Sequence, residues 1–175
     1  MKFCILLTAA MLHAGDRAPL DVPFYSQQKN GCGAASVAMV AHYWANQAGV
    51  ESPPPLEVYR SLYDESRQGV PLSGMRTYLE RLGYRAFTFR GEWTDLVKQT
   101  GRGRPVIVGL QKNEHAELHF VVVTGVSLSE VAVNDPAKRS ARKVQRGAFA
   151  RQWAQAGSWM LLAAPVRQDS TSATQ

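Results

Sequence analysis

One cysteine has a sequence setting that favours chemistry. Cys32 directly follows Asn30 and Gly31 and begins an alanine-rich, proline-free run that predicts a helix over residues 32–47. The first turn of a helix carries unpaired N–H groups and partial positive charge, and both favour the thiolate, which is the nucleophilic form of cysteine. A free cysteine is also often a small buried apolar residue, so position alone leaves the nucleophilic and packing roles equally open.

A nucleophilic thiol needs a base, and the chain offers four histidines: His13, His42, His115 and His119. His42 lies on the same predicted helix as Cys32, about 15 Å further along, which is too far to accept its proton. His119 begins the apolar run HFVVVTGV, which predicts a strand and therefore a rigid position for a base. His115 falls in a polar segment that predicts a loop, and His13 lies in an N-terminal apolar segment. We therefore expect His119 to be the base.

A metal site built from His115 and His119 is the alternative use of these histidines. They are four residues apart with Glu114 and Glu117 nearby, a spacing that could hold a metal on a helix. The valine-rich sequence after His119 favours a strand instead. The sequence therefore predicts neither a metal site nor a cofactor.

The base in turn needs an acceptor that orients its ring, and Asn134 and Asp135 follow the next predicted strand. If that strand pairs with the strand beginning at His119 around a three-residue loop, Val121 faces Asp135. Asp135 and His119 then share one face of the sheet on a diagonal of about 7 Å, while Asn134 points to the other face. A loop of two or four residues would reverse this choice, and Asp-Pro is also a common turn pair.

A carbonyl attacked by a thiolate needs hydrogen-bond donors for the negative charge that develops on its oxygen. The backbone N–H of Cys32 supplies one donor at the helix start. A side-chain amide just upstream could supply the second, from Gln27 or Gln28, although both could be plain turn residues. Position alone slightly favours Gln27, at the end of the extended segment.

Length, composition and charge exclude several other classes of protein. The chain has 175 residues, which suits one domain, and its two cysteines, Cys4 and Cys32, are too few for a disulfide framework or a cysteine-rich zinc module. The formal charge is +6, and the basic residues are densest over 138–146. No aromatic residue interleaves that run and no nucleic-acid-binding motif accompanies it, so we interpret it as solvated surface and expect no nucleic-acid partner.

The N-terminus predicts export. Residues 1–15 combine Lys2, a short apolar stretch and the small residues Ala14 and Gly15, which is the layout of a secretory signal, although the cleavage site is imperfect. The expected location is the periplasm or the outside of the cell, or the cytoplasm if this segment is not a signal. No stretch reaches the length of about 20 residues that spans a bilayer, so stable membrane insertion is not expected.

The elements expected along the chain are helices first and then a mostly antiparallel sheet, an α+β fold. An extended entry strand is expected over 19–26, and it leads into a turn. The predicted helices cover residues 32–47, 56–64, 72–82, 93–100 and 149–156, and the predicted strands cover 84–89, 105–110, 119–126, 130–134 and 158–164. Ser73 is expected to cap the third helix and Gly83 to end it. Residues 167–175 predict a disordered tail.

Three segments together make the sequence similar to a known family. They are VPFYSQQKNGCGAASVAMV, then HFVVVTGV, then VAVNDPA, and the similarity extends over residues 20–165. In this order they resemble the papain-like cysteine peptidases of the bacteriocin-processing, double-glycine-leader type, and more closely their stand-alone bacterial relatives. The resemblance implies a papain-like fold with a peptidase-like domain over residues 19–166.

The resemblance also implies roles for individual residues. Cys32 would be the nucleophile, His119 the general base and acid, Asp135 the orienting residue and Gln27 the oxyanion donor. The expected activity is hydrolysis of a peptide or protein substrate through a thioester acyl-enzyme, by a monomer without a metal. Alternatives are a cell-wall amidase or transpeptidase using the same triad, or a non-catalytic peptide-binding module. The best-known members cut leaders after Gly-Gly and are fused to a transporter, whereas this sequence shows no membrane-spanning segment.

Overall fold

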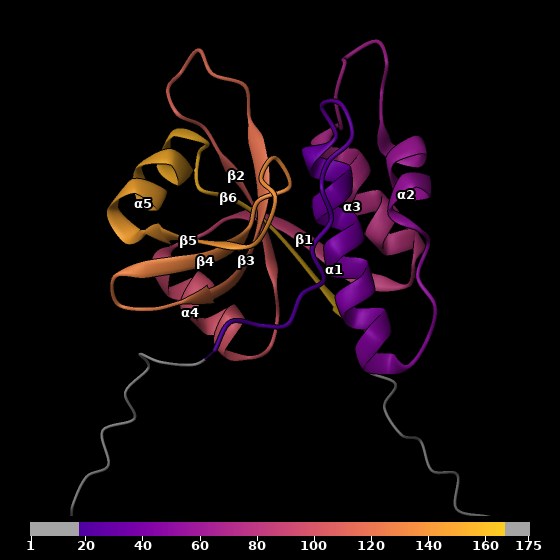
Figure 1. Ribbon diagram of the computed structural model, residues 1–175, viewed down its shortest axis with the longest axis horizontal. Coiled ribbons are helices and arrows are strands. Elements are labelled where there is room, and N and C mark those ends of the chain that lie inside the picture. The colour runs from indigo at the N-terminus through magenta and orange to yellow at the C-terminus, as the bar shows by residue number, and fades with distance from the viewer. Residues whose placement is uncertain (1–17, 167–175) are drawn as a thin grey trace, which may run out of the picture.

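The computed structural model describes residues 18–166, which form five helices and six strands (Figure 1). The helices are α1 (Cys32–Ala48), α2 (Pro55–Leu62), α3 (Leu72–Arg81), α4 (Trp93–Gly101) and α5 (Arg146–Gln155). The strands are β1 (Tyr84–Arg90), β2 (Val106–Leu110), β3 (His119–Val126), β4 (Glu130–Asn134), β5 (Arg142–Gln145) and β6 (Trp159–Pro165). The predicted export signal over 1–15 and the predicted tail over 167–175 lie outside the described residues.

The strands form one sheet in the order β1-β6-β2-β3-β4-β5, and every neighbouring pair is antiparallel. Helices α1, α2 and α3 form a layer beside the sheet, on the right in Figure 1. Helices α4 and α5 pack against the other face. The α+β prediction, with N-terminal helices followed by an antiparallel sheet, is confirmed.

Successive side chains along the central strands point to opposite faces of the sheet, and apolar residues on both faces let helices cover each of them. Ile107 of β2 and Val122 of β3 belong to the apolar core shared with α1, whereas their neighbours Val108 and Val121 belong to the core shared with α4 and α5. All four side chains are buried. The sheet is thus buried on both faces at its centre.

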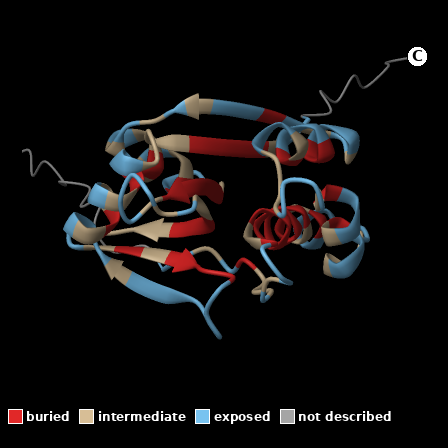
Figure 2. Ribbon diagram, turned by 90° about the horizontal axis from the view of Figure 1, so that it is seen from above, coloured by how far each residue is buried: buried red, intermediate tan, exposed pale blue. Residues whose placement is uncertain are grey.

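Helix α1 is the most deeply buried helix of its layer. Ala34, Ala38 and Ala41 are fully buried on it, and their small side chains let the helix approach its neighbours closely. Figure 2 shows this helix end-on, coloured as buried, beside the sheet. Its last turn is closed by Gly49, whose φ of 66° suits glycine and whose N–H bonds to Ala45 and Asn46. This buried packing fixes the position of the helix start, where Cys32 lies.

Two local predictions are wrong. Ser73 does not cap α3, because the helix begins one residue earlier at Leu72, after Pro71, and no side chain caps it. The residues over 19–26 form no strand, although Leu20 N–H donates to Thr124 of β3 at 2.9 Å. The expectation that Gly83 ends α3 holds, since its φ is 88° directly after the last turn.

The sequence also failed to predict β5. This strand has four residues at the edge of the sheet, three of them exposed, and it falls in the basic run over 138–146. A four-residue strand with Val144 as its one apolar residue is too short for its alternation to stand out in the sequence. It pairs with β4 from Glu130 to Val133.

The hairpin of β3 and β4 has a longer loop than expected. Val126 pairs with Val131, so four residues lie between the paired positions instead of three. A β-bulge between Val123 and Gly125 then shifts the register by one residue, and Val122 pairs with Asn134. A Cβ on Gly125 would lie 3.2 Å from the backbone of Pro19, which makes a side chain there difficult to accommodate. The bulge restores the register that the three-residue loop had predicted.

Candidate active site

Cys32 is the first residue of α1, and its thiol is free and partly exposed. Gly31 precedes it as the N-cap and makes no side-chain cap, so the first N–H groups of the helix are not occupied by a capping side chain. Asn30 adopts a φ of 51°, which turns the chain into the helix. A Cβ on Gly31 would lie 2.7 Å from the ring of Tyr59, so a side chain there would have to displace that ring. This tight turn presents Cys32 at the end of a rigid helix.

His119 and Asp135 meet where β3 begins and β4 has just ended. His119 Nε2 donates to Asp135 Oδ1 at 2.7 Å. The Asp135 side chain is only 3% exposed, whereas that of His119 is 31% exposed. The backbone N–H of Ala137 donates to the same oxygen at 3.1 Å, and Arg142 Nη2 lies 2.9 Å from the other oxygen, Oδ2. Both carboxylate oxygens are therefore held.

The interactions of His119 set its charge. Burial lowers its pKa, but hydrogen bonds with Asp135 and with Cys32, together with the charges of both groups, outweigh burial and raise the pKa from 6.5 to about 9. The imidazole therefore carries a proton at neutral pH. Because Asp135 occupies Nε2, Nδ1 is the nitrogen left for the sulfur of Cys32.

Asp135 is a buried carboxylate that stays charged. Burial raises its pKa, but the hydrogen bond and charge of His119, the N–H of Ala137 and the charge of Arg142 lower it further, so the pKa ends below its usual value. A charged group can be buried at tolerable cost only when its hydrogen bonds are satisfied in this way. Of the two acceptor candidates, Asn134 bonds instead to the carbonyl of Val22.

Gln27 lies beside Cys32, and Gln28 does not. The backbone N–H of Gln27 donates to Pro136 O at 2.9 Å, which ties the segment before α1 to the residue that follows Asp135. Among the described residues, Oε1 of Gln27 is buried without a hydrogen-bond partner. Gln28 is exposed, and its carbonyl accepts from Gly31.

A cleft of about 380 Å³ joins these groups, and we call it the thiol cleft. Gln27, Cys32 and His119 all line it. One wall is the segment over 67–70 that leads into α3, and the other is the segment over 117–120 at the start of β3. The cleft therefore runs between the helical layer and the sheet.

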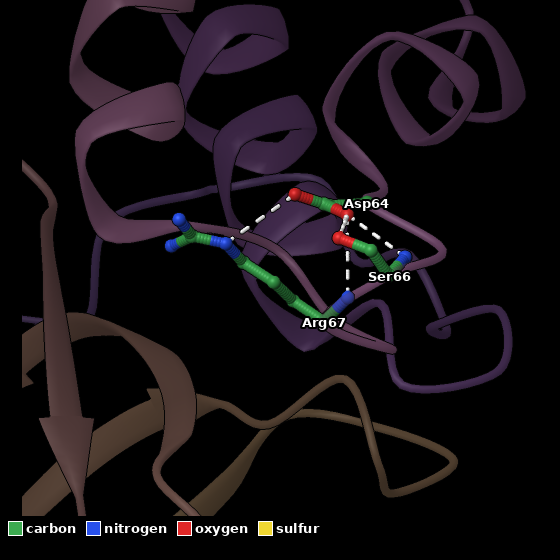
Figure 3. A network of polar contacts seen from close by, with 3 residues as sticks. All are labelled: Asp64, Ser66 and Arg67. Carbon is green, nitrogen blue, oxygen red and sulfur yellow. Dashed lines mark hydrogen bonds and ion pairs between the residues drawn. The ribbon is translucent and has the colours of Figure 1, made fainter.

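A network of polar contacts around Asp64 holds the wall formed by residues 67–70 (Figure 3). The sequence did not predict this network. Asp64 Oδ1 accepts from the N–H of Ser66 at 2.9 Å, from its hydroxyl at 2.6 Å and from the N–H of Arg67 at 3.2 Å. Arg67 Nε lies 3.4 Å from Oδ2, and Asp64 also pairs through its backbone with Gly69. The hydrogen bond from Ser66 is the largest cause that lowers the pKa of Asp64. Asp followed two residues later by Ser is the signal of such a turn.

The other histidines have different surroundings. His42 is held between the hydroxyl of Tyr25 and the carbonyl of Pro53, each at 2.9 Å, which is a packing role on α1. His115 is exposed beside Glu114 in the loop between β2 and β3. Neither lines the thiol cleft, and His13 lies outside the described residues.

Arg142 contacts Asp135, although it belongs to the basic run over 138–146 that was predicted to be solvated surface. Its strand was not predicted, so nothing indicated that one member of the basic run points toward Asp135. Arg142 pairs with Val133 of β4, which lies two residues before Asp135 in the sequence.

The chain is similar to peptidases in three comparisons. A family model described as "Peptidase_C39 like family" matches residues 19–160. A curated relative, the Lactococcin-G-processing and transport ATP-binding protein LagD of Lactococcus lactis subsp. lactis, is 27% identical over 130 residues. That match covers 74% of this chain but only 17% of the relative.

Solved structures share the fold. One is a double glycine motif protease from an AMS/PCAT transporter in complex with the leader peptide, with a TM-score of 0.64 and 24% identity over 87% of this chain and 97% of that one. A putative C39-like peptidase from Bacillus anthracis has a TM-score of 0.67 and 18% identity, covering 87% and 100% of the two chains. The peptidase domain of Streptococcus ComA has a TM-score of 0.64 and 21% identity, covering 81% and 97%. Among residues 18–166, no helix combines the length and apolarity that crossing a bilayer requires.

Proposed function

This chain belongs to the Peptidase_C39 like family, and on that premise we propose that it is a cysteine peptidase with Cys32 as nucleophile, His119 as base and acid, and Asp135 as orienting residue. The observation that carries the proposal is the 2.7 Å bond from His119 to Asp135, in a ring that also interacts with the Cys32 thiol. A thiol, a base and an orienting acceptor in this chain of contacts are what thiol catalysis requires.

In the first step the thiolate attacks the carbonyl carbon of the substrate. His119 takes the proton of Cys32, and the raised pKa of the imidazole favours the charged ring that results. A bond forms between Sγ and the carbonyl carbon, and the electron pair of the C=O bond moves onto oxygen. The backbone N–H of Cys32 and the side-chain amide of Gln27 donate to this oxyanion.

In the second step the peptide bond breaks. His119 gives its proton to the leaving nitrogen as the C–N bond cleaves, which leaves a thioester on Cys32 and a neutral imidazole. Water then attacks the thioester while His119 accepts its proton, and the acyl group leaves as a carboxylic acid. Asp135 keeps the ring oriented and stabilises its charge throughout.

The substrate class we propose is a peptide presented in extended form along the thiol cleft. A solved structure with this fold, a double glycine motif protease in complex with the leader peptide, supports this choice. A Gly-Gly pair before the scissile bond is therefore the first sequence to test. The chain spans about 17% of the curated relative, so the transport function in that relative's name is not carried over.

The test compares two histidine variants and one cysteine variant of the full chain. Synthetic peptides with Gly-Gly before the scissile bond are incubated with wild type, Cys32→Ala, His119→Ala and His115→Ala, and products are measured by mass spectrometry. His115→Ala is the matched control, because it removes the same side chain four residues away on an exposed loop. We expect the first two variants to lose activity by a factor of about 10⁴ or more and the control to retain it.

Labelling and trapping extend the test beyond one substrate. Wild type is expected to react with iodoacetamide at Cys32 faster than a free thiol at pH 6, and to form a covalent adduct whose mass equals the acyl part of the peptide. Equal hydrolysis by wild type and Cys32→Ala would overturn the proposal. Ordinary thiol reactivity together with no hydrolysis of any peptide would favour a binding module.

A further inference from the structure

A second hollow borders His119, and Cys32 does not line it. Its volume is about 450 Å³, and His119 and Asp135 line it together with Lys112, Glu117, Lys138 and Arg142. His119 and Glu117 also line the thiol cleft, but Cys32 and Gln27 do not reach the second hollow. His119 therefore stands between two depressions, of which only one contains the nucleophile.

The walls of this hollow are basic. Lys112, Lys138 and Arg142 contribute cations, and Glu117 contributes a carboxylate. Arg142 is paired with Asp135, but Lys112 and Lys138 form no ion pair among residues 18–166. Both lysines are exposed at the rim. The second hollow thus has two unpaired positive charges beside a His119 that is itself protonated at neutral pH.

The chemistry of the reaction divides the substrate between the two depressions. The acyl half becomes bonded to Cys32 and its oxyanion lies near Gln27, so this half must occupy the thiol cleft. The leaving nitrogen receives its proton from His119, so the leaving half begins at His119. The hollow that borders His119 without bordering Cys32 is the space into which that half continues.

From this placement we propose that the second hollow binds the residues that follow the scissile bond and selects carboxylate side chains there. The inference rests on the proposed function for the direction of the chain. Two lysines at the rim provide ammonium groups for one or two carboxylates, and the backbone of an extended peptide passes between them and His119. This assigns part of the basic run over 138–146 to recognition of an acidic peptide.

A binding measurement tests the charge preference without requiring turnover. Three labelled octapeptides with a free amino terminus, identical except for a leading Glu-Glu, Gln-Gln or Lys-Lys, are titrated with the full wild-type chain by fluorescence anisotropy. We expect Glu-Glu to bind roughly fivefold more tightly than Gln-Gln at 50 mM salt, and the difference to shrink at 500 mM salt because exposed charges are then screened.

Three lysine variants locate the effect. Lys138→Gln and Lys112→Gln are each expected to weaken Glu-Glu binding roughly two- to threefold while leaving Gln-Gln binding unchanged. Lys143→Gln is the matched control, since it removes one charge from the same basic run but does not line the hollow. All three lysines are exposed, so their replacement does not disturb the core.

Cleavage rates separate this inference from the proposed function. Peptides with Gly-Gly before the scissile bond and Glu-Glu after it should show a higher kcat/KM than those with Lys-Lys, and Lys138→Gln should reduce the difference. Equal binding of the three octapeptides, or an equal loss in Lys143→Gln, would overturn the subsite. Preferential binding of the Glu-Glu peptide without cleavage of any peptide would support the acidic-peptide site and overturn the proposed peptidase activity.

Discussion

Arg142 Nη2 lies 2.9 Å from Asp135 Oδ2, the carboxylate oxygen that does not contact His119. The Arg142 side chain is 44% exposed and the Asp135 side chain 3% exposed, so a surface cation reaches a buried anion. The acceptor is thereby fixed between two positive groups on opposite sides, and its plane cannot rotate without losing one of them. Arg142 therefore orients Asp135, and Asp135 in turn orients His119.

Arg142→Gln should weaken catalysis at low pH first. Removing the cation lets Asp135 take up a proton at higher pH, because the charge of Arg142 lowers the pKa of that carboxyl. A protonated Asp135 no longer stabilises the charged imidazole, so the acid limb of kcat should move to higher pH with KM little changed. Arg139→Gln, which changes the same charge nearby, should leave the profile in place; an unchanged profile in Arg142→Gln would count against the contact.

Asp135→Asn should lower the pKa of His119 and reduce kcat by about 10²–10⁴. The hydrogen bond and charge of Asp135 both raise that pKa in the native protein. The measurement is an NMR titration of the imidazole, which in wild type should show a midpoint near 9. Asn134→Ala provides the comparison, since it loses a buried bond to Val22 and should cost stability without moving the midpoint. A midpoint near 6.5 in wild type would contradict the geometry.

Stability should fall as the pH rises through the alkaline range. The folded pKa of His119 is about 9 against 6.5 for the free group, so its pairing contributes fully to the free energy of unfolding below pH 6.5. That contribution decreases above pH 6.5, because the unfolded chain loses its proton first, and it is gone once the pH passes 9.

Chemical denaturation of wild type and His119→Gln between pH 5 and 10 measures this loss. The difference between their free energies of unfolding should be largest at pH 5 to 6 and should vanish near pH 10. The lowered pKa of Asp135 acts in the opposite direction, with stability lost as the pH falls below the range of a free carboxyl. A difference that grows with rising pH would show that His119 is not held in its charged form.

Gln27→Leu should separate activity from stability. Loss of the amide removes an oxyanion donor, which costs about 10²–10³ in kcat. The same change removes a buried oxygen without a hydrogen-bond partner among the described residues, so the free energy of unfolding should rise by about 1 kcal/mol. Gln28→Leu is the control and should change neither quantity, because that side chain is exposed. Reduced stability in Gln27→Leu would mean that the amide has a structural partner.

Most elements of the fold could be predicted from the sequence because their patterns are strong. The alanine-rich run of α1 and the apolar run of β3 are strong patterns. The glycines and prolines between the elements limited where each element could begin and end. The edge strand β5 could not be predicted, because three of its four residues are polar and its pairing depends on β4. Arg142 was missed for that reason alone.

Asp135 rather than Asn134 contacts His119, as predicted, although the predicted loop length was wrong. The hairpin loop has four residues, which by itself would have placed Asn134 on the face of His119. The bulge between Val123 and Gly125 inserts the compensating residue. The bulge lies where the backbone of Pro19, distant in sequence, passes close to Gly125, and no local pattern indicates that approach.

The order of the site's residues along the chain has a consequence for synthesis. Cys32 is made early and its helix early, but the imidazole that would activate it follows only with β3, and the guanidinium that fixes the acceptor only with β5. A growing chain therefore carries the thiol without the imidazole until β3 has been made. Because edge strand β5 comes last of the three, the contacts of the candidate site can be complete only when nearly the whole sheet has been synthesised.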